Sequence, residues 1–126
     1  MRKEILNWWN QAKRDLGTAE YNLAGKRFEV VIFFCHQAVE KALKALIMLK
    51  ESKAEVASHS LIFLAKEAKL PEKFHSFLRE LSPQYILTRY PDAAEEAPFE
   101  LFDLERATKI LKNSQEVIEW IKKQIG

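Results

Sequence analysis

Residues 27–51 carry apolar side chains on nearly every side of a helix, and this segment constrains the fold most strongly. Apolar residues recur there at spacings of three and four, which is the repeat of a helical face. The main stripe consists of Val31, Phe34, Ala38, Ala42, Ala45 and Leu49, and further apolar residues are Val30, Phe33, Val39, Leu43, Leu46 and Ile47. Such a helix must be covered on several sides, so the sequence predicts the central helix of a bundle or a helix that also enters a dimer interface.

The segments around this helix show helical patterns as well. Residues 3–24 place their apolar side chains on one stripe, and Gly25 follows where a left-handed helix-ending residue is expected. The short connection after it makes the first two helices an antiparallel hairpin. Three of the 4 prolines lie in residues 82–101, which we expect to form a long irregular connection.

The sequence therefore predicts an all-α fold that forms a single domain over residues 1–126. Short loops make consecutive helices neighbours, so we expect an antiparallel up-and-down helical bundle of three long and two short helices. The expected helices are Lys3–Ala24, Arg27–Glu51, Leu61–Lys69, Pro71–Leu81 and Asp103–Gln124.

Charge and hydropathy exclude several classes of protein. A formal net charge of +2 is too small to indicate a nucleic-acid surface by itself. No apolar run has the length of a signal peptide or approaches the ~18 residues of a transmembrane helix, so we expect no membrane contact and a cytoplasmic location. Cys35, the only cysteine, lies in an apolar run and is expected to be buried.

Residues that carry chemistry are sparse. His36, His59 and His75 are scattered, and Glu72 with His75 forms a single Glu-x-x-His unit where a carboxylate metal site needs two. Motifs for a nucleophilic serine and for a glycine-rich phosphate loop are missing. We therefore expect no metal and no cofactor, and we expect His59, just before the third helix, to make a structural hydrogen bond.

A first candidate site lies on the second helix, where polar residues interrupt the apolar surface. His36 and Glu40 are four residues apart, as are Glu40 and Lys44, so each pair shares a face. Gln37 and Lys41 lie with Lys44 along an adjoining face. Two interpretations stay open: a nearby arginine neutralises Glu40 while the lysines reach solvent, or these residues line a groove for an anion or nucleotide.

A second candidate site is the stretch Thr-Arg-Tyr-Pro-Asp at residues 88–92. Arg89 can pair with a phosphate while Tyr90 stacks on a base, and Asp92 follows two residues later. The alternative is that Arg89 docks back onto a carboxylate of the bundle, Glu40 or Asp15. The two interpretations do not exclude each other.

Several sequence elements together resemble the HEPN domain family, whose members are small helical-bundle proteins of archaea and bacteria. These elements are A-x-x-D-L-x-x-A at residues 12–19, F-x-x-H-Q-A-V-E-K-A-L-K-A-L at 33–46, H-S-L at 59–61 and R-Y-P at 89–91. The resemblance covers nearly the whole chain, and the Q-A-V-E-K-A-L-K and R-Y-P elements are its most specific parts.

The resemblance implies a homodimer that works beside a minimal nucleotidyltransferase, as in toxin–antitoxin pairs or related two-component systems, and nucleotide binding has been proposed for the family. Some members are metal-independent ribonucleases in which an arginine is followed, after four to six residues, by a histidine. After Arg89 the corresponding positions hold Ala94, Glu95 and Glu96. This departure argues against RNA cleavage, and acidic residues at these positions disfavour an RNA backbone.

These observations lead to a binding or interaction module as the first hypothesis, with direct nucleotide binding as an accompanying property. The alternative is a divergent ribonuclease that uses Arg89 with His36 or His59. The aromatic side chains of Trp8, Trp9 and Phe28 are expected to be exposed and to favour a homodimer. The candidate contact residues are His36, Glu40, Lys41, Lys44, His59, Arg89, Tyr90 and Asp92.

Overall fold

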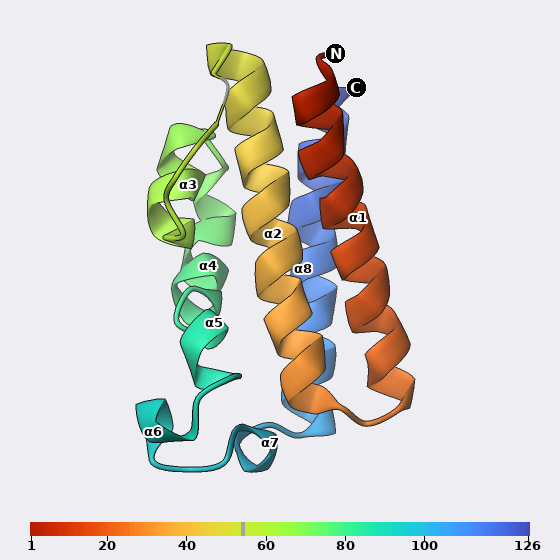
Figure 1. The fold of residues 1–126 in the computed structure, drawn as a ribbon, viewed down its shortest axis with the longest axis vertical. Coiled ribbons are helices and arrows are strands. Elements are labelled where there is room, and N and C mark those ends of the chain that lie inside the picture. The colour runs from red at the N-terminus through yellow and green to blue at the C-terminus, as the bar shows by residue number, and fades with distance from the viewer. Residues whose placement is uncertain (54) are drawn as a thin grey trace.

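The fold is built from helices throughout the part of the chain that the computed structural model describes, residues 1–53 and 55–126. Three long helices form its body: α1 (Lys3–Ala24), α2 (Phe28–Glu51) and α8 (Leu104–Ile125). Helix α1 runs antiparallel to α2 and to α8, and these two run in the same direction (Figure 1). Figure 1 shows them side by side, with both chain termini at the same end of the bundle. This arrangement confirms the predicted all-α bundle. Within the described ranges, no helix combines the length and apolar character needed to cross a membrane.

Helix α2 is the central helix, as its apolar sequence predicts. It packs against α1, against α8 and against the short helices on its remaining side (Figure 1). The buried side chains of α2 include Ile32, Leu43 and Leu46, each with no measurable exposure. Because α2 has neighbours on several sides, its nearly continuous apolar surface is covered within one chain.

The turn between α1 and α2 corrects one local expectation. Gly25 has a φ of −80°, and the left-handed conformation falls on the next residue, Lys26, with a φ of 60°. Backbone hydrogen bonds from Lys26 to Leu23 and from Arg27 to Asn22 close the turn at 3.1 and 3.2 Å. These bonds satisfy carbonyl groups at the end of α1 and allow the chain to reverse within a few residues.

The short helices form a second layer along α2, on the side away from α1 (Figure 1). They are α3 (Leu61–Glu67), the 3-10 turn η1 (Glu72–Phe74), α4 (His75–Leu81), α5 (Gln84–Leu87), α6 (Pro91–Ala94) and α7 (Pro98–Leu101). The hydroxyl oxygen of Ser60 accepts a hydrogen bond from the backbone of Phe63 at 3.2 Å, so Ser60 caps α3.

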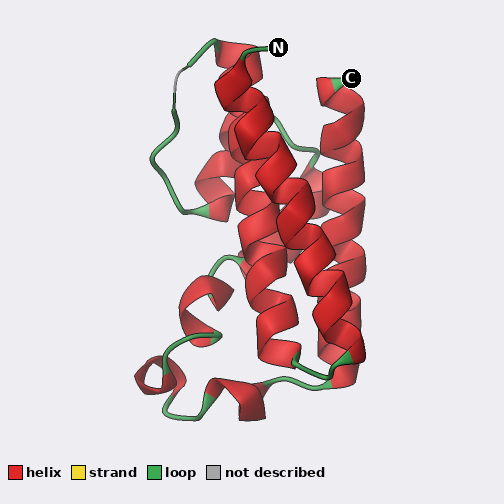
Figure 2. Ribbon diagram, turned by 45° about the vertical axis from the view of Figure 1, so that its right-hand side comes forward, coloured by secondary structure: helices red, strands yellow, loops and turns green. Residues whose placement is uncertain are grey.

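Residues 82–101 are more regular than predicted, because they contain the single-turn helices α5, α6 and α7. Pro91 and Pro98 begin α6 and α7. Proline suits a first helical position because its fixed φ is already helical and its missing N–H has no partner there. Figures 1 and 2 both show α6 and α7 at the end of the bundle opposite the chain termini.

The aromatic residues near the N-terminus are less exposed than expected. Trp9 belongs to the core, packed with Ile5 and Ala12 on the inner face of α1, while Trp8 and Phe28 are half-buried. The expectation of an exposed Trp9 was wrong because Trp9 lies on the same stripe as Ile5 and Ala12, the stripe that faces α2.

Candidate functional site

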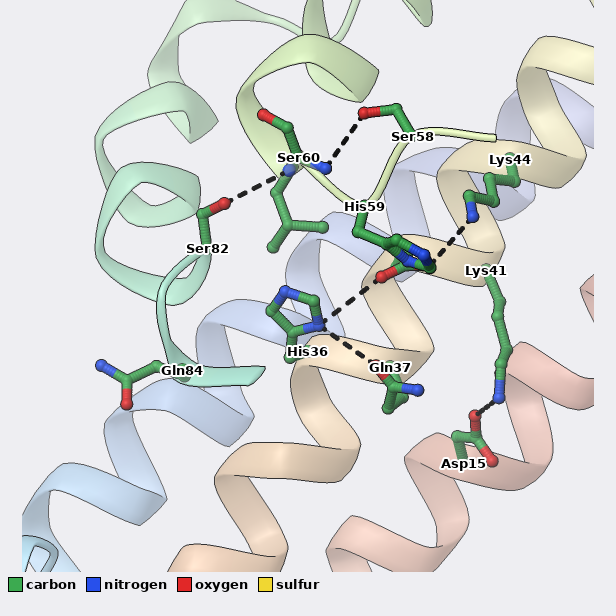
Figure 3. A network of polar contacts seen from close by, with 12 residues as sticks. Asp15, His36, Gln37, Lys41, Lys44, Ser58, His59, Ser60, Ser82 and Gln84 are labelled. Atoms are coloured by element: carbon green, nitrogen blue, oxygen red, sulfur yellow. Dashed lines mark hydrogen bonds and ion pairs between the residues drawn. The ribbon is translucent and has the colours of Figure 1, made fainter. Parts of the chain in front are cut away.

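A polar cluster surrounds the carboxylate of Glu40 in the middle of α2. The Lys44 ammonium and the Nδ1 atom of His59 each lie 3.0 Å from Oε2 of Glu40, and Nδ1 of His36 lies 3.8 Å from Oε1. His36, Glu40 and Lys44 come from successive turns of α2. Figure 3 shows that His59 reaches this helix from the segment before α3. The cluster therefore brings together two of the sequence elements that carried the family resemblance, residues 33–46 and 59–61.

The ion pair at the centre of this cluster is buried. Glu40 is 5% exposed and Lys44 is 3% exposed. The Lys44 ammonium also lies 5.2 Å from the centre of the Trp8 ring, where a cation–π contact helps to replace its lost hydration. The expectations of an arginine partner for Glu40 and of a solvent-reaching Lys44 were wrong, because Lys44 is near enough along the helix to neutralise Glu40 itself.

His36 is the least accessible member of the cluster, since its side chain is completely buried. Burial lowers the pKa of His36 from its ordinary value of 6.5, although Glu40 and Gln37 oppose this shift. Nδ1 of His36 lies 3.3 Å from Oε1 of Gln37, so a neutral imidazole donates its Nδ1 proton to that oxygen. Nε2 of His36 has no hydrogen-bond partner among the described residues. His36 is thus a neutral, buried imidazole at pH 7.

Tyr85 of α5 completes the cluster and was missed by the sequence analysis. Its ring stacks on His36 at a centroid distance of 5.7 Å and on His59 at 6.0 Å, with interplanar angles of 30° and 13°. The contact depends on where the chain places α5, so no spacing in the sequence could have revealed it. Tyr85 packs the second layer onto the polar face of α2.

Lys41 does not belong to the Glu40 cluster, although the sequence grouped the two. Its ammonium lies 2.5 Å from Oδ2 of Asp15 in α1, and the side-chain amide of Gln11 donates to the other oxygen of Asp15 at 2.8 Å. Figure 3 shows Lys41 pointing toward Asp15 of α1, whereas the Glu40 carboxylate contacts His59. Lys41 therefore connects α1 to α2, beside a surface depression of about 270 Å³ that Trp8 also lines.

Arg89 lies at the far end of α2, at the turn after α5. Its guanidinium carbon is 5.1 Å from the centre of the Phe33 ring and 5.5 Å from the centre of the Tyr90 ring. Within the described ranges the guanidinium has no ion-pair partner. The alternative in which Arg89 docks onto Glu40 or Asp15 is therefore not observed, because lysines already occupy both carboxylates.

A small pocket of about 250 Å³ accompanies Arg89. Its lining residues are Glu29, Val30, Phe33, Phe34, Thr88 and Arg89. Tyr90 is 48% exposed, and Asp92 is exposed in the first turn of α6. The structure thus places Arg89, Tyr90 and Asp92 at one end of the bundle, separate from the Glu40 cluster.

Metal binding and thiol chemistry have no built site in the described part of the chain. No group of three or more histidine, cysteine, aspartate or glutamate side chains there is arranged to hold a metal ion. Burial raises the pKa of the Cys35 thiol to about 12, so the thiolate needed for nucleophilic chemistry does not form at neutral pH.

The architecture defines a small all-helical bundle with a buried histidine–glutamate–lysine cluster on its central helix. The sequence model of the HEPN domain matches residues 5–124, and the chain belongs to this family. No curated protein matches the sequence significantly.

Solved structures agree with this family assignment. The chain resembles ST0689, an archaeal HEPN homologue, with a TM-score of 0.83 and 31% identity, over 99% of this chain and 100% of that one. It also resembles TT1696 from Thermus thermophilus, with a TM-score of 0.87 and 25% identity, over 98% of this chain and 99% of that one.

Proposed function

We propose that the protein is a homodimeric, non-catalytic HEPN interaction module that binds a nucleotide phosphate at Arg89 and works with a nucleotidyltransferase-fold partner. The partner and the homodimer come from what the family resemblance implies. The nucleotide site rests on one observation, the Arg89 guanidinium held beside two aromatic rings without a carboxylate partner.

The surroundings of Arg89 support binding of an anionic, planar ligand. A guanidinium offers five N–H donors in a fixed fork that matches a phosphate, and its lack of an ion pair leaves these donors available. The half-exposed ring of Tyr90 offers a face on which a base can stack. Phe33 and Tyr90 hold the guanidinium in place, which lowers the entropy cost of binding.

Two features argue for binding without catalysis. After four to six intervening residues, the positions that follow Arg89 hold Ala94, Glu95 and Glu96, so no histidine stands where the family ribonucleases have one. His36 is completely buried beside Glu40 and Tyr85, where it cannot reach a substrate. The site thus retains the phosphate-binding arginine and lacks an accessible acid–base group at the expected position.

An affinity pull-down from the native host, followed by intact-mass analysis of this chain, tests the partnership. We expect a nucleotidyltransferase-fold protein to copurify in defined stoichiometry, or a covalently attached nucleotide on this chain. Recovery of an unmodified chain together with only its own copies would contradict the partnership. Arg89→Gln is the informative variant, and Arg106→Gln is its control, because Arg106 likewise lies over an aromatic ring, at 5.1 Å from Phe102.

A divergent ribonuclease is the second candidate, and one observation favours it. The side chain of His59 is 65% exposed while its Nδ1 contacts the buried Glu40, an arrangement that orients an imidazole for acid–base work. In this case Arg89→Ala and His59→Ala would each abolish RNA cleavage by repurified protein. Cleavage that both variants retain would indicate a contaminating nuclease.

A further inference from the structure

A half-buried carboxylate lies in the same pocket as Arg89. Glu29 belongs to the first turn of α2 and lines this pocket together with Phe33 and Arg89. Glu29 and Phe33 are four residues apart and so share a face of α2, and the Arg89 guanidinium lies over the Phe33 ring at 5.1 Å. Glu29 forms no ion pair with any described residue. The pocket therefore presents a carboxylate and a guanidinium that are not paired with each other.

The carboxylate of Glu29 restricts what the pocket accepts. It repels a phosphate, and it attracts groups that donate hydrogen bonds, because a carboxylate can only accept them. A ligand that contacts both side chains must therefore carry an anionic group for Arg89 and hydrogen-bond donors for Glu29. A nucleotide meets both requirements when a phosphate contacts the arginine and the edge of the base contacts the glutamate.

The size and the walls of the pocket suit a single base. Its volume of about 250 Å³ lies below the roughly 300–1,000 Å³ of sites that enclose a whole drug-sized ligand. Val30, Phe33 and Phe34 give it apolar and aromatic walls against which a planar ring packs. The exposed ring of Tyr90, which lies beside the same guanidinium at 5.5 Å, is free to cover the outer face of that base.

Among the common bases, only guanine offers two adjacent donors that match a carboxylate. Its N1–H and its N2 amino group point in the same direction, so they reach both oxygens of one carboxylate as a guanidinium does. Adenine and cytosine place an acceptor nitrogen beside their single amino group, and uracil places its N–H between two carbonyl oxygens. Each of these three bases therefore turns an acceptor toward the carboxylate.

We propose that Glu29 makes the Arg89 site selective for guanine nucleotides, with its carboxylate accepting hydrogen bonds from N1–H and the N2 amino group while Arg89 holds a phosphate. This inference rests on the nucleotide site of the proposed function and names the class of nucleotide that the site takes. The alternative role of Glu29 is structural, because an acidic residue in a first turn stabilises the positive end of the helix dipole. A purely structural role predicts no difference between bases.

Isothermal titration calorimetry with GTP and inosine triphosphate tests this selectivity, because the base of inosine triphosphate lacks only the N2 amino group. The wild type should bind GTP about tenfold more tightly than inosine triphosphate, and ATP more weakly than GTP. Glu29→Gln should abolish the preference for GTP. The same variant should bind xanthosine triphosphate more tightly than the wild type does, because the glutamine amide donates to O2 of xanthine and still accepts from N1–H.

Glu105→Gln is the matched control. Glu105 likewise lies in the first turn of a long helix, α8, and its replacement changes the net charge equally. This variant should keep the wild-type order of affinities for all four nucleotides. A gain of xanthosine triphosphate binding in Glu29→Gln alone would be a result that loss of a helix-stabilising charge does not produce.

The outcomes separate the guanine selectivity from the phosphate site itself. Equal affinity of the wild type for GTP and inosine triphosphate would overturn the selectivity and leave the phosphate site at Arg89 standing. A preference for GTP that Glu29→Gln retains would likewise overturn the role of Glu29. If the wild type bound none of the nucleotides, both the selectivity and the phosphate site would be overturned.

Discussion

Nδ1 of His59 lies 3.0 Å from Oε2 of Glu40, and this contact fixes the segment before α3 onto the middle of α2. The same carboxylate oxygen receives the Lys44 ammonium at 3.0 Å. Glu40 thus connects the central helix to the layer of short helices through a nearly buried charge. Because a buried carboxylate is costly without partners, each of these contacts is needed by the fold.

Replacement of Lys44 tests how strongly the fold depends on this ion pair. Lys44→Met should lower the free energy of unfolding by about 3–5 kcal/mol, because it leaves the Glu40 carboxylate buried with its main cation removed. Glu40→Leu combined with Lys44→Met should recover most of the loss, since no unpaired charge then remains. Urea denaturation of both proteins measures the effect. Additive losses in the double variant would show that the two charges do not interact.

The buried imidazole of His36 should make stability depend on pH. The pKa of His36 is lowered in the folded chain and returns to 6.5 on unfolding. At a pH below 6.5 and above the folded-state pKa, the unfolded chain therefore binds more protons than the folded chain. This contribution to the free energy of unfolding is complete above pH 6.5 and is lost as the pH falls below 6.5. Chemical denaturation across this range should show a steeper decline for the wild type than for His36→Gln. If the free energy of unfolding declined with pH equally in the wild type and in His36→Gln, this would contradict a buried neutral histidine.

The thiol of Cys35 should be inert while the chain is folded. It is completely buried and its pKa is raised to about 12, so few thiolates exist and reagents cannot reach them. Iodoacetamide at mildly alkaline pH should label the native chain only after denaturant is added, as mass spectrometry would reveal. Ser76→Cys provides an exposed thiol as control. Rapid labelling of Cys35 in the native chain would show that the core opens readily.

Much of the fold could be predicted because helical periodicity encodes it directly. The apolar residues on nearly all sides of α2 indicated a central helix, and α2 indeed contacts both long helices and the second layer. The single-turn helices of residues 82–101 could not be predicted from periodicity, because one turn is too short to display a repeat. For α6 and α7, the prolines at their first positions, Pro91 and Pro98, were the local signal.

The Glu40 cluster was predictable only along its own helix. The spacing of four residues placed His36, Glu40 and Lys44 on one face, and the structure confirms that they lie together. The stacking of Tyr85 on the two histidines and the contact between His59 and Glu40 depend on the path of the chain after α2. The sequence pattern does not specify this path.

Lys41 shows a different limit of sequence reasoning. It follows Glu40 directly in the sequence, but adjacent residues of a helix point about 100° apart, so it faces Asp15 of α1 instead. The rotation of α1 relative to α2 had to be known before Lys41 could be assigned to Glu40 or to Asp15. The same limit applies to Arg89, whose contact with Phe33 depends on the turn after α5.

The central claim is that the Arg89 site holds a nucleotide phosphate, and isothermal titration calorimetry tests it most directly. We predict that ATP or GTP binds the wild type and Arg106→Gln with equal affinity, and binds Arg89→Gln at least tenfold more weakly. Tyr90→Ala should weaken the binding of nucleotides more than the binding of inorganic pyrophosphate, because only a nucleotide has a base to stack on the ring. Binding heat that Arg89→Gln leaves unchanged, or no heat from the wild type at millimolar nucleotide, would contradict a phosphate site at Arg89.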